Sequence, residues 1–380
     1  MRRFLALSAL LLVALSVTQI RGDHAAVETP AGIGKIGVVY HWWTPGTTAE
    51  SELASFRRLK ALGIDWIRWD ASWANFEDAC KRCYSWAVMD RVNANLRTAG
   101  LKSLALVGST PEWAREPCST CTGELSWIPP RNMDDYADAV RAYLERYPDT
   151  AAVEIWNEPW HGGFWKPVPE PARYAEMVTA GARAAKDVHP SIPVIASGDL
   201  WMTEGAEGEF FRPMLTELTR RDPQIGEFVD GWAVHPYSEA RPPGDTTAEP
   251  EYRYSRGLIT RRIALELGVP EAIWQTEFGW SSAEPPSRQY PATDEELQAQ
   301  YTVRALELAH GSAGWGYEGP SMIYVWGPSE GPTVNNRLGQ YGMLRADRTE
   351  KPVVAAVASL RGYRTARAAP PADEHERGVR

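Results

Sequence analysis

Two glutamates stand at the ends of short apolar runs, in places where packing alone does not call for a carboxylate. Glu158 closes the run in "VEIWNEPW" (153–160), and Glu277 closes the run in "IWQTEFGW" (273–280). Both runs are rich in β-branched and aromatic residues, which favours strands. Two carboxylates that face each other across an aromatic cleft are what glycosidic cleavage uses: one protonates the leaving oxygen and the other attacks the anomeric carbon.

Eight β-rich runs alternate with helix-patterned segments along the chain, which predicts repeated βα units and a parallel sheet. The expected strands cover 36–43, 64–70, 101–108, 152–159, 192–198, 229–237, 271–280 and 321–327. The expected helices include 50–63, 89–100, 133–147, 172–190, 256–268, 293–311 and 351–360. Eight such units close into one α/β fold, a single (β/α)8 TIM barrel, whereas a doubly wound sheet would need fewer strands and a glycine-rich phosphate turn.

The barrel brings the two glutamates to one mouth, because catalytic groups in this fold come from the carboxyl ends of the strands. Glu158 ends the fourth expected strand and Glu277 ends the seventh. Strand alternation places Glu158 on the same face as Trp156, and Glu277 on the same face as Gln275 and Ile273.

Strand alternation also turns Glu154 into the barrel, beneath Glu158. An unpaired charge there would be costly. We therefore expect Glu154 to have a basic or hydrogen-bonding partner on a neighbouring strand, with Arg68 and His235 among the candidates.

The composition is that of a globular protein, with 44% hydrophobic residues and a net charge of −9. An acidic chain without a block of basic residues argues against nucleic acid as a partner. The 17 Trp and 15 Tyr outnumber the 8 Phe. Such rings either stack on the C–H faces of sugars or fill a large core.

The N-terminus carries two arginines, Arg2 and Arg3, followed by an apolar stretch over 4–17. This stretch is short for a membrane helix but typical of a secretory signal. We expect a signal peptide over 1–26, with an uncleaved anchor as the alternative, a glycosidase TIM-barrel domain over 33–364, and a disordered tail over 365–380. The expected location is secreted or in the cell envelope, without further membrane association.

Four cysteines occur as "CKRC" (Cys80, Cys83) and "CSTC" (Cys118, Cys121). They fall in the loops behind the second and third expected strands. The pattern allows a structural zinc site with four thiolates, or two disulfides that cross between the loops, and export favours the disulfides. Either arrangement would stiffen one wall of the cleft.

"WNEP" after the fourth strand, together with "TEFGW" after the seventh, resembles the retaining (β/α)8 glycoside hydrolases of clan A. "GSTPEWA" (108–114) and "WNEPW" are closest to family 39 and family 5-like enzymes, and the resemblance spans about residues 33 to 362. It implies that Glu158 is the acid/base, that Glu277 is the nucleophile, and that Asn157 binds the 2-hydroxyl of the sugar.

The same resemblance assigns supporting roles to residues at three other strand ends. Arg68 in "IRWD" matches an arginine beside the nucleophile, where its charge would keep Glu277 ionised. The plainer alternative is a surface pair with Asp70. Tyr237 in "VHPYS" matches a tyrosine that donates a hydrogen bond to the nucleophile, and His235 is a weaker candidate, since a strand-end histidine is often structural.

Four tryptophans and one histidine are candidates for sugar contacts. Trp326 in "YVWG" would form the floor of the sugar site, and His41, Trp42, Trp43 and Trp113 would line outer subsites. The alternative for each is packing at the barrel rim or between loops.

The sequence thus predicts an exported retaining glycosidase that cleaves β-linked O-glycosidic bonds in an oligo- or polysaccharide by double displacement, without a catalytic cofactor. The alternative is a non-catalytic carbohydrate-binding TIM barrel, which would keep the aromatic cleft but has no need for both Glu158 and Glu277. A metal-dependent hydrolase would need clusters of inward His and Asp, and the chain has only 7 His.

Overall fold

The computed structural model describes residues 35–199, 210–283, 292–327 and 340–360. The expected signal segment (1–26) and the expected tail (365–380) lie outside the described residues. Within the described ranges, no helix is both long enough and apolar enough to cross a membrane.

Eight parallel strands form a closed barrel, in which each strand pairs with the next along the chain and β8 pairs with β1. The strands are β1 (Ile36–Tyr40), β2 (Trp66–Ser72), β3 (Lys102–Gly108), β4 (Ala152–Ile155), β5 (Val194–Ser197), β6 (Gly231–Val234), β7 (Ile273–Phe278) and β8 (Ser321–Ile323). The predicted (β/α)8 barrel is therefore confirmed. β1, β4, β6 and β8 each end three or four residues earlier than expected.

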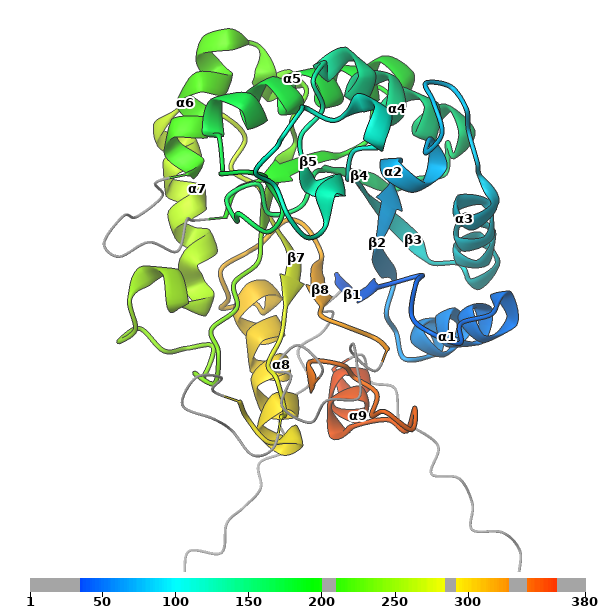
Figure 1. The fold of residues 1–380 in the computed structure, drawn as a ribbon. Helices are drawn as coiled ribbons and strands as arrows, with labels where there is room; N and C mark the ends of the chain where they lie inside the picture. The colour runs from blue at the N-terminus through cyan, green and yellow to red at the C-terminus, as the bar shows by residue number, and fades with distance from the viewer. Residues whose placement is uncertain (1–34, 200–209, 284–291, 328–339, 361–380) are drawn as a thin grey trace, which may run out of the picture.

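A ring of helices surrounds the strands (Figure 1). The helices are α1 (Ala49–Ala61), α2 (Trp73–Phe76), α3 (Ala87–Ala99), α4 (Met133–Arg146), α5 (Pro171–Val188), α6 (Phe211–Arg221), α7 (Gly257–Glu266), α8 (Glu295–His310) and α9 (Pro352–Ser359). Helix α6, whose segment contains Pro213, was not among the helices named from the sequence. That proline is the third helical residue, and a proline is tolerated in the first turn, where no intrahelical partner is lost.

Several helix ends follow from local sequence. Thr48 caps α1 in a capping box with Ser51, and the side chains of Asn132 and Asp294 accept backbone N–H groups at the starts of α4 and α8. Helix α3 ends at Gly100, whose φ of 70° is left-handed. These caps fix where each helix begins or ends, and so fix the lengths of the loops that carry the site.

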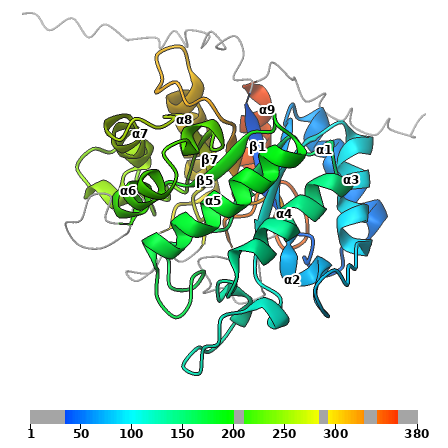
Figure 2. The ribbon, with the colours of Figure 1, turned by 90° about the horizontal axis from the view of Figure 1, so that it is seen from above.

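The loops at the carboxyl ends of the strands are long behind β3 and β4. The segment between β3 and α4 includes the short 3-10 helices η1 (Glu112–Ala114) and η2 (Leu125–Trp127). It projects on the side of the barrel where α2 lies (Figure 2). Further 3-10 helices are η3 (Ile225–Glu227), η4 (Pro250–Tyr252) and η5 (Tyr254–Arg256).

The interior of the barrel is filled by side chains from the strands themselves. This inner cluster is separate from the larger apolar core that joins the strands to the helices. Its members are Val39, Leu104, Ala152, Ile195, Ala233, Trp274, Met322 and Val325, with Trp66 and Tyr324 packed against it. The indole rings of Trp66 and Trp274 meet edge to face, with their centroids 5.7 Å apart.

Glycines leave room for side chains of this inner cluster. A Cβ at Gly319 would lie 2.1 Å from the ring of Trp274, and a Cβ at Gly37 would lie 2.1 Å from Sδ of Met322 and 2.8 Å from the Cβ of Trp66. Close packing leaves no slack to absorb such contacts. The glycines are therefore needed here for space, not for an unusual backbone conformation.

We predict that Gly319→Ala lowers the free energy of unfolding by about 1–3 kcal/mol, because the added methyl group must displace the ring of Trp274. Chemical denaturation measures the change. Gly244→Ala is the control, since no atom lies within 4 Å of its added Cβ, and we expect a change within about 0.5 kcal/mol. Equal effects of the two substitutions would contradict this account of the barrel interior.

Candidate active site

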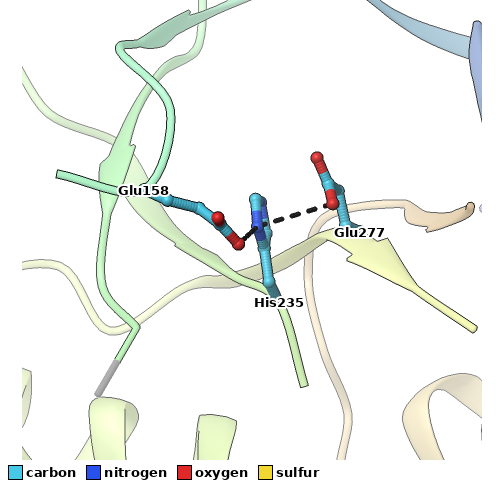
Figure 3. A group of neighbouring side chains, drawn as sticks. All are labelled: Glu158, His235 and Glu277. Carbon is cyan, nitrogen blue, oxygen red and sulfur yellow. Dashed lines mark hydrogen bonds and ion pairs between the residues drawn. The ribbon is translucent and has the colours of Figure 1, made fainter. Parts of the chain in front are cut away.

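Three ionisable side chains meet at the mouth of the barrel (Figure 3). Glu158 follows β4, His235 follows β6, and Glu277 lies in β7. Nδ1 of His235 is 2.7 Å from Oε1 of Glu158 and 3.7 Å from Oε2 of Glu277. One ligand atom of each residue lies within 4.8 Å of the others, so a carboxylate oxygen of Glu158 is within 4.8 Å of one of Glu277. The structure brings the two predicted glutamates together.

Glu158 reaches the mouth through a left-handed turn and not through strand alternation. Strand β4 ends at Ile155, and both Trp156 (φ 64°) and Glu158 (φ 39°) have positive φ. The indole of Trp156 is buried on the helix side, where its N–H donates to the carbonyl oxygen of Phe164 and its ring packs against Tyr136 of α4. The expectation that Trp156 and Glu158 share a face is therefore wrong. Strained backbone of this kind is common at functional sites.

Glu277 reaches the mouth through an irregularity in β7. The pairing of β7 with β8 shifts register between Gln275 and Phe278. Ile273 belongs to the core on the helix side, and Gln275 bonds Tyr254 of that core, whereas Thr276 and Glu277 both bond residues inside the barrel. The predicted common face of Ile273, Gln275 and Glu277 is wrong. A bulge turns Glu277 inward, and bulges commonly re-aim a side chain beside an active site.

Arg68 joins the strands beneath the site. Its Nε donates to Oε2 of Glu154 at 2.6 Å, its Nη1 to Oε1 of Glu277 at 2.6 Å, and its Nη2 to the amide oxygen of Asn157 at 2.9 Å. Arg68 and Glu154 are 2% and 1% exposed. The expectation that Glu154 points inward and has Arg68 as its partner is confirmed, and the alternative of a surface pair between Arg68 and Asp70 is wrong.

The surroundings of Glu277 favour its ionised form. Burial alone would raise the pKa of Glu277, but the charges of His235 and Arg68 and the hydrogen bond from Tyr237 together lower it below the ordinary value. The expected hydrogen bond from Tyr237 is present, with its hydroxyl donating to Oε2 at 2.7 Å. Burial and the nearby carboxylate raise the pKa of Tyr237 well above its ordinary value, so the phenol keeps its proton.

The hydrogen bonds of His235 define which of its nitrogens carries a proton. The hydroxyl of Thr276 donates to Oε1 of Glu154 at 2.9 Å, so it must accept from Nε2 of His235, 3.0 Å away. The hydrogen bond between Nδ1 of His235 and Oε1 of Glu158 then holds a second proton, which can sit on either residue. Burial would lower the pKa of His235, but Glu277 and Glu158 raise it. His235 is thus part of the site, not a structural bystander.

A buried ion pair braces the backbone of His235 and Tyr237. Arg256 donates to Asp199 (Nε to Oδ1, 2.9 Å), to the carbonyl oxygen of Tyr237 (2.8 Å) and to that of His235, and Oδ2 of Asp199 accepts the backbone N–H of His235 at 3.1 Å. Asp199 and Arg256 are each 1% exposed. Sequence reasoning missed this pair and Thr276. Of these residues, only Thr276 could have been found from the sequence, because it is adjacent to Glu277.

The predicted tryptophans differ in their positions. Trp326 is buried in the core on the helix side and lines a small pocket with residues of α1, so the expectation that it forms the floor of the sugar site is not met. Trp113 packs edge to face on Trp73, and its N–H donates to the carbonyl oxygen of Glu77, which is a loop-packing role. Trp42 and Trp43 both line an open pocket.

Each cysteine pair forms a disulfide within its own C-x-x-C motif, Cys80 with Cys83 and Cys118 with Cys121. The expected crossing between the two loops is therefore wrong, since neighbouring cysteines in one turn already lie close together. In the disulfide form these sulfurs are not available as thiolate ligands for zinc.

A metal ion could in principle be held by Glu158, His235 and Glu277, whose ligand atoms are close enough together. However, Glu277 already accepts hydrogen bonds from Arg68 and Tyr237. A fixed guanidinium charge within 2.6 Å of the carboxylate opposes a second cation, and the arrangement suits proton transfer and nucleophilic attack better.

We predict that Arg68→Met lowers the free energy of unfolding by about 3–5 kcal/mol, because it leaves Glu154 as a buried charge without its cation. Arg58→Met is the control: its ion pair with Glu350 is exposed, and we expect a loss of about 1 kcal/mol or less. Denaturation at several pH values measures both.

The pH dependence has a defined sign. Arg68 is one of the groups that lower the pKa of Glu277. The stability that Arg68 contributes through this carboxylate is therefore fully present above pH 4.5, the ordinary pKa, and is lost as the pH falls through the lowered pKa of the folded state. The difference in the free energy of unfolding between the wild type and Arg68→Met should therefore become smaller at acidic pH. A deficit that does not change with pH would mean that Arg68 contributes through packing only.

No protein-family model matches the sequence, and no curated protein matches it. Solved structures do match. The family 39 glycoside hydrolase from the gut symbiont Bacteroides cellulosilyticus WH2 aligns with a TM-score of 0.64 at 23% identity, over 86% of this chain and 63% of that one. This chain therefore spans less than two thirds of the length of that enzyme.

Two further matches have similar scores. The monomeric β-xylosidase from Caulobacter crescentus CB15 aligns with a TM-score of 0.62 at 20% identity, over 88% of this chain and 70% of that one. A glucosidase from Croceicoccus marinus aligns with a TM-score of 0.62 at 15% identity, over 88% and 68%. Over most of its length, the chain thus matches the fold of family 39 and related clan A (β/α)8 glycoside hydrolases.

Proposed function

We propose that this protein is a retaining glycoside hydrolase that cleaves β-linked O-glycosidic bonds in an oligo- or polysaccharide. The observation that carries the proposal is the pair of carboxylates with oxygens within 4.8 Å of each other, one of them held ionised by Arg68 and Tyr237. Retaining enzymes have carboxyl groups about 5–5.5 Å apart, whereas inverting enzymes need about 6.5–9.5 Å to admit a water molecule. The structural match to a β-xylosidase and a glucosidase supports the substrate class.

In the first step, Glu277 attacks the anomeric carbon and forms a glycosyl-enzyme. Glu158 donates its proton to the glycosidic oxygen as the bond to the leaving group breaks. The amide oxygen of Asn157 is bound to Arg68, so its N–H groups are the donors that it offers to a sugar hydroxyl.

In the second step, Glu158 takes a proton from water, which attacks the anomeric carbon and releases Glu277. His235 shares the proton of Glu158 through the 2.7 Å bond, so the pair holds one proton before each cycle and regains it afterwards. The reaction needs no cofactor, because the two carboxylates supply the acid, the base and the nucleophile.

The alternative of a non-catalytic sugar-binding barrel is less well supported. Binding alone does not require an ionised glutamate on a fixed arginine, or an acid that shares a proton with a buried histidine. Such a network is costly to bury, and its arrangement around one cleft is what catalysis uses.

We also propose export. The support is the arginine pair and apolar stretch at the N-terminus, together with the two disulfides, which persist in oxidising compartments. Fractionation of cells that express the full chain measures its location. Full recovery from the cytoplasm would contradict export.

We predict that Glu277→Gln abolishes hydrolysis of 4-nitrophenyl β-glycosides, because the amide cannot form the glycosyl-enzyme. Glu158→Ala lowers kcat/KM on oligosaccharides by about 10²–10⁴-fold, and by less on 4-nitrophenyl glycosides, whose leaving group needs little protonation. Glu145→Gln, an exposed glutamate on α4, is the control and should behave as wild type. Activity that survives in Glu277→Gln would refute the assignment.

The stereochemical outcome gives a separate test. In a double displacement the first sugar released has the same anomeric configuration as the substrate, and NMR during the first turnovers detects it. Added azide should restore Glu277→Ala by acting as an external nucleophile. A product of inverted configuration from the wild type would overturn the retaining mechanism.

We further predict a pH effect of His235→Asn. The raised pKa of His235 keeps the shared proton in place above the ordinary histidine value of 6.5. The variant leaves the proton to a carboxyl group alone, so the alkaline limb of kcat/KM should move to lower pH. An unchanged limb would show that His235 does not share the proton.

A further inference from the structure

We infer that a second, uncharged sugar unit of the substrate binds in a pocket over the carboxyl ends of β1, β2 and β3. This inference rests on the proposed function and adds to it the place and the charge of a sugar beyond the one that reacts. The pocket has a volume of about 280 Å³, near the lower end of small-molecule sites, which suits one sugar unit.

The pocket is connected to the catalytic cluster through side-chain contacts. Its wall includes Asp70, two residues after Arg68 on the inner face of β2. Oδ2 of Asp70 is 3.2 Å from Nδ1 of His41, and Nε2 of His41 is 3.3 Å from the hydroxyl of Tyr324. The ring of Tyr324 meets the ring of Tyr237 edge to face. A chain of direct contacts therefore joins the pocket to the residue that holds the nucleophile.

The pocket presents aromatic rings that are fixed in place. Trp43 stacks on His41, with centroids 4.5 Å apart, yet is 44% exposed, which is unusual for a residue of its size. The N–H of Trp42 donates to the carbonyl oxygen of Asp70 at 3.0 Å, and Trp127 completes the wall. Rings held in this way offer apolar faces to the C–H groups of a sugar at little entropic cost.

The polar part of the pocket fits hydroxyl groups and excludes anions. Ser72 and Ser109 point their hydroxyls at each other at 2.7 Å, and the carboxylates of Asp70 and Glu124 also line the pocket. The backbone N–H of Ser126 is the main cause of a lowered pKa for Glu124, with smaller contributions from the charges of Arg115 and Lys166.

The charge of the lining selects between sugars. None of the described residues that line the pocket is Lys or Arg. The carboxylates of Asp70 and Glu124 disfavour uronic acids and sulfated sugars, whereas they accept hydrogen bonds from neutral hydroxyls.

The test compares two substrates of one sugar. A panel of 4-nitrophenyl β-xyloside, glucoside, galactoside and mannoside first identifies the sugar that the wild type cleaves. The ratio of kcat/KM for the matching tetrasaccharide to kcat/KM for the 4-nitrophenyl glycoside is then measured. We expect Trp43→Ala to lower this ratio about tenfold, which corresponds to the loss of one stacked ring.

The matched control is Tyr84→Ala, another exposed aromatic ring, which stacks on Trp86 outside the pocket. It should leave the ratio unchanged. An unchanged ratio in Trp43→Ala would overturn the inference. If the wild type cleaves none of the glycosides, or if Glu277→Gln retains activity, the proposed function fails and the inference fails with it. The two failures are therefore distinguishable.

Charge selection is tested by calorimetry with Glu277→Gln, which binds without turnover. The ligands are the neutral tetrasaccharide and the same compound with acidic groups: the C6-oxidised form for a hexose, or the glucuronic-acid-substituted form for xylose. We expect the acidic form to bind at least about tenfold more weakly. Equal or tighter binding of the acidic form would contradict the assignment of an uncharged sugar to this pocket.

Discussion

The buried guanidinium of Arg68 is the interaction on which the site depends. Burial of an arginine and a glutamate costs several kcal/mol per ion unless every charge finds a partner. Here the cation is shared between Glu154 and Glu277, and its Nη2 also donates to the amide oxygen of Asn157. Side chains from three strands and one turn therefore take up fixed positions around one charge. Removing it would leave two carboxylates to repel each other inside the barrel.

Two local departures from regular β-structure aim the carboxylates at each other. A left-handed turn after β4 sends Trp156 into the core on the helix side and Glu158 into the mouth. A bulge in β7 places Thr276 and Glu277, which are adjacent in sequence, on the same side of the strand. Neither arrangement is favourable for an isolated strand. Buried contacts on the helix side hold each one, through Trp156 after β4 and through Gln275 in β7.

These departures mark the limit of what the sequence could predict. The alternation of strands and helices gave the barrel, and the cost of a buried charge gave Glu154 its partner Arg68. The alternation of side chains along a strand could not reveal the bulge, because one extra residue moves every later side chain to the opposite face of the sheet. The same limit applies to Trp326, which lies behind a strand shorter than its apolar run. The crossed pairing of the cysteines was wrong, because sequence spacing does not define connectivity.

The buried ion pair of Asp199 and Arg256 braces one part of the barrel rim. It fixes the main chain directly after β6, at His235 and Tyr237, so a change there would disturb the side chains that contact Glu158 and Glu277. The opposite part of the rim, over β1 to β3, reaches Glu277 through the side chain of Arg68, and its loops line the pocket. Under the proposed function, substitutions among the pocket residues can change which sugar binds, provided that Arg68 stays in place.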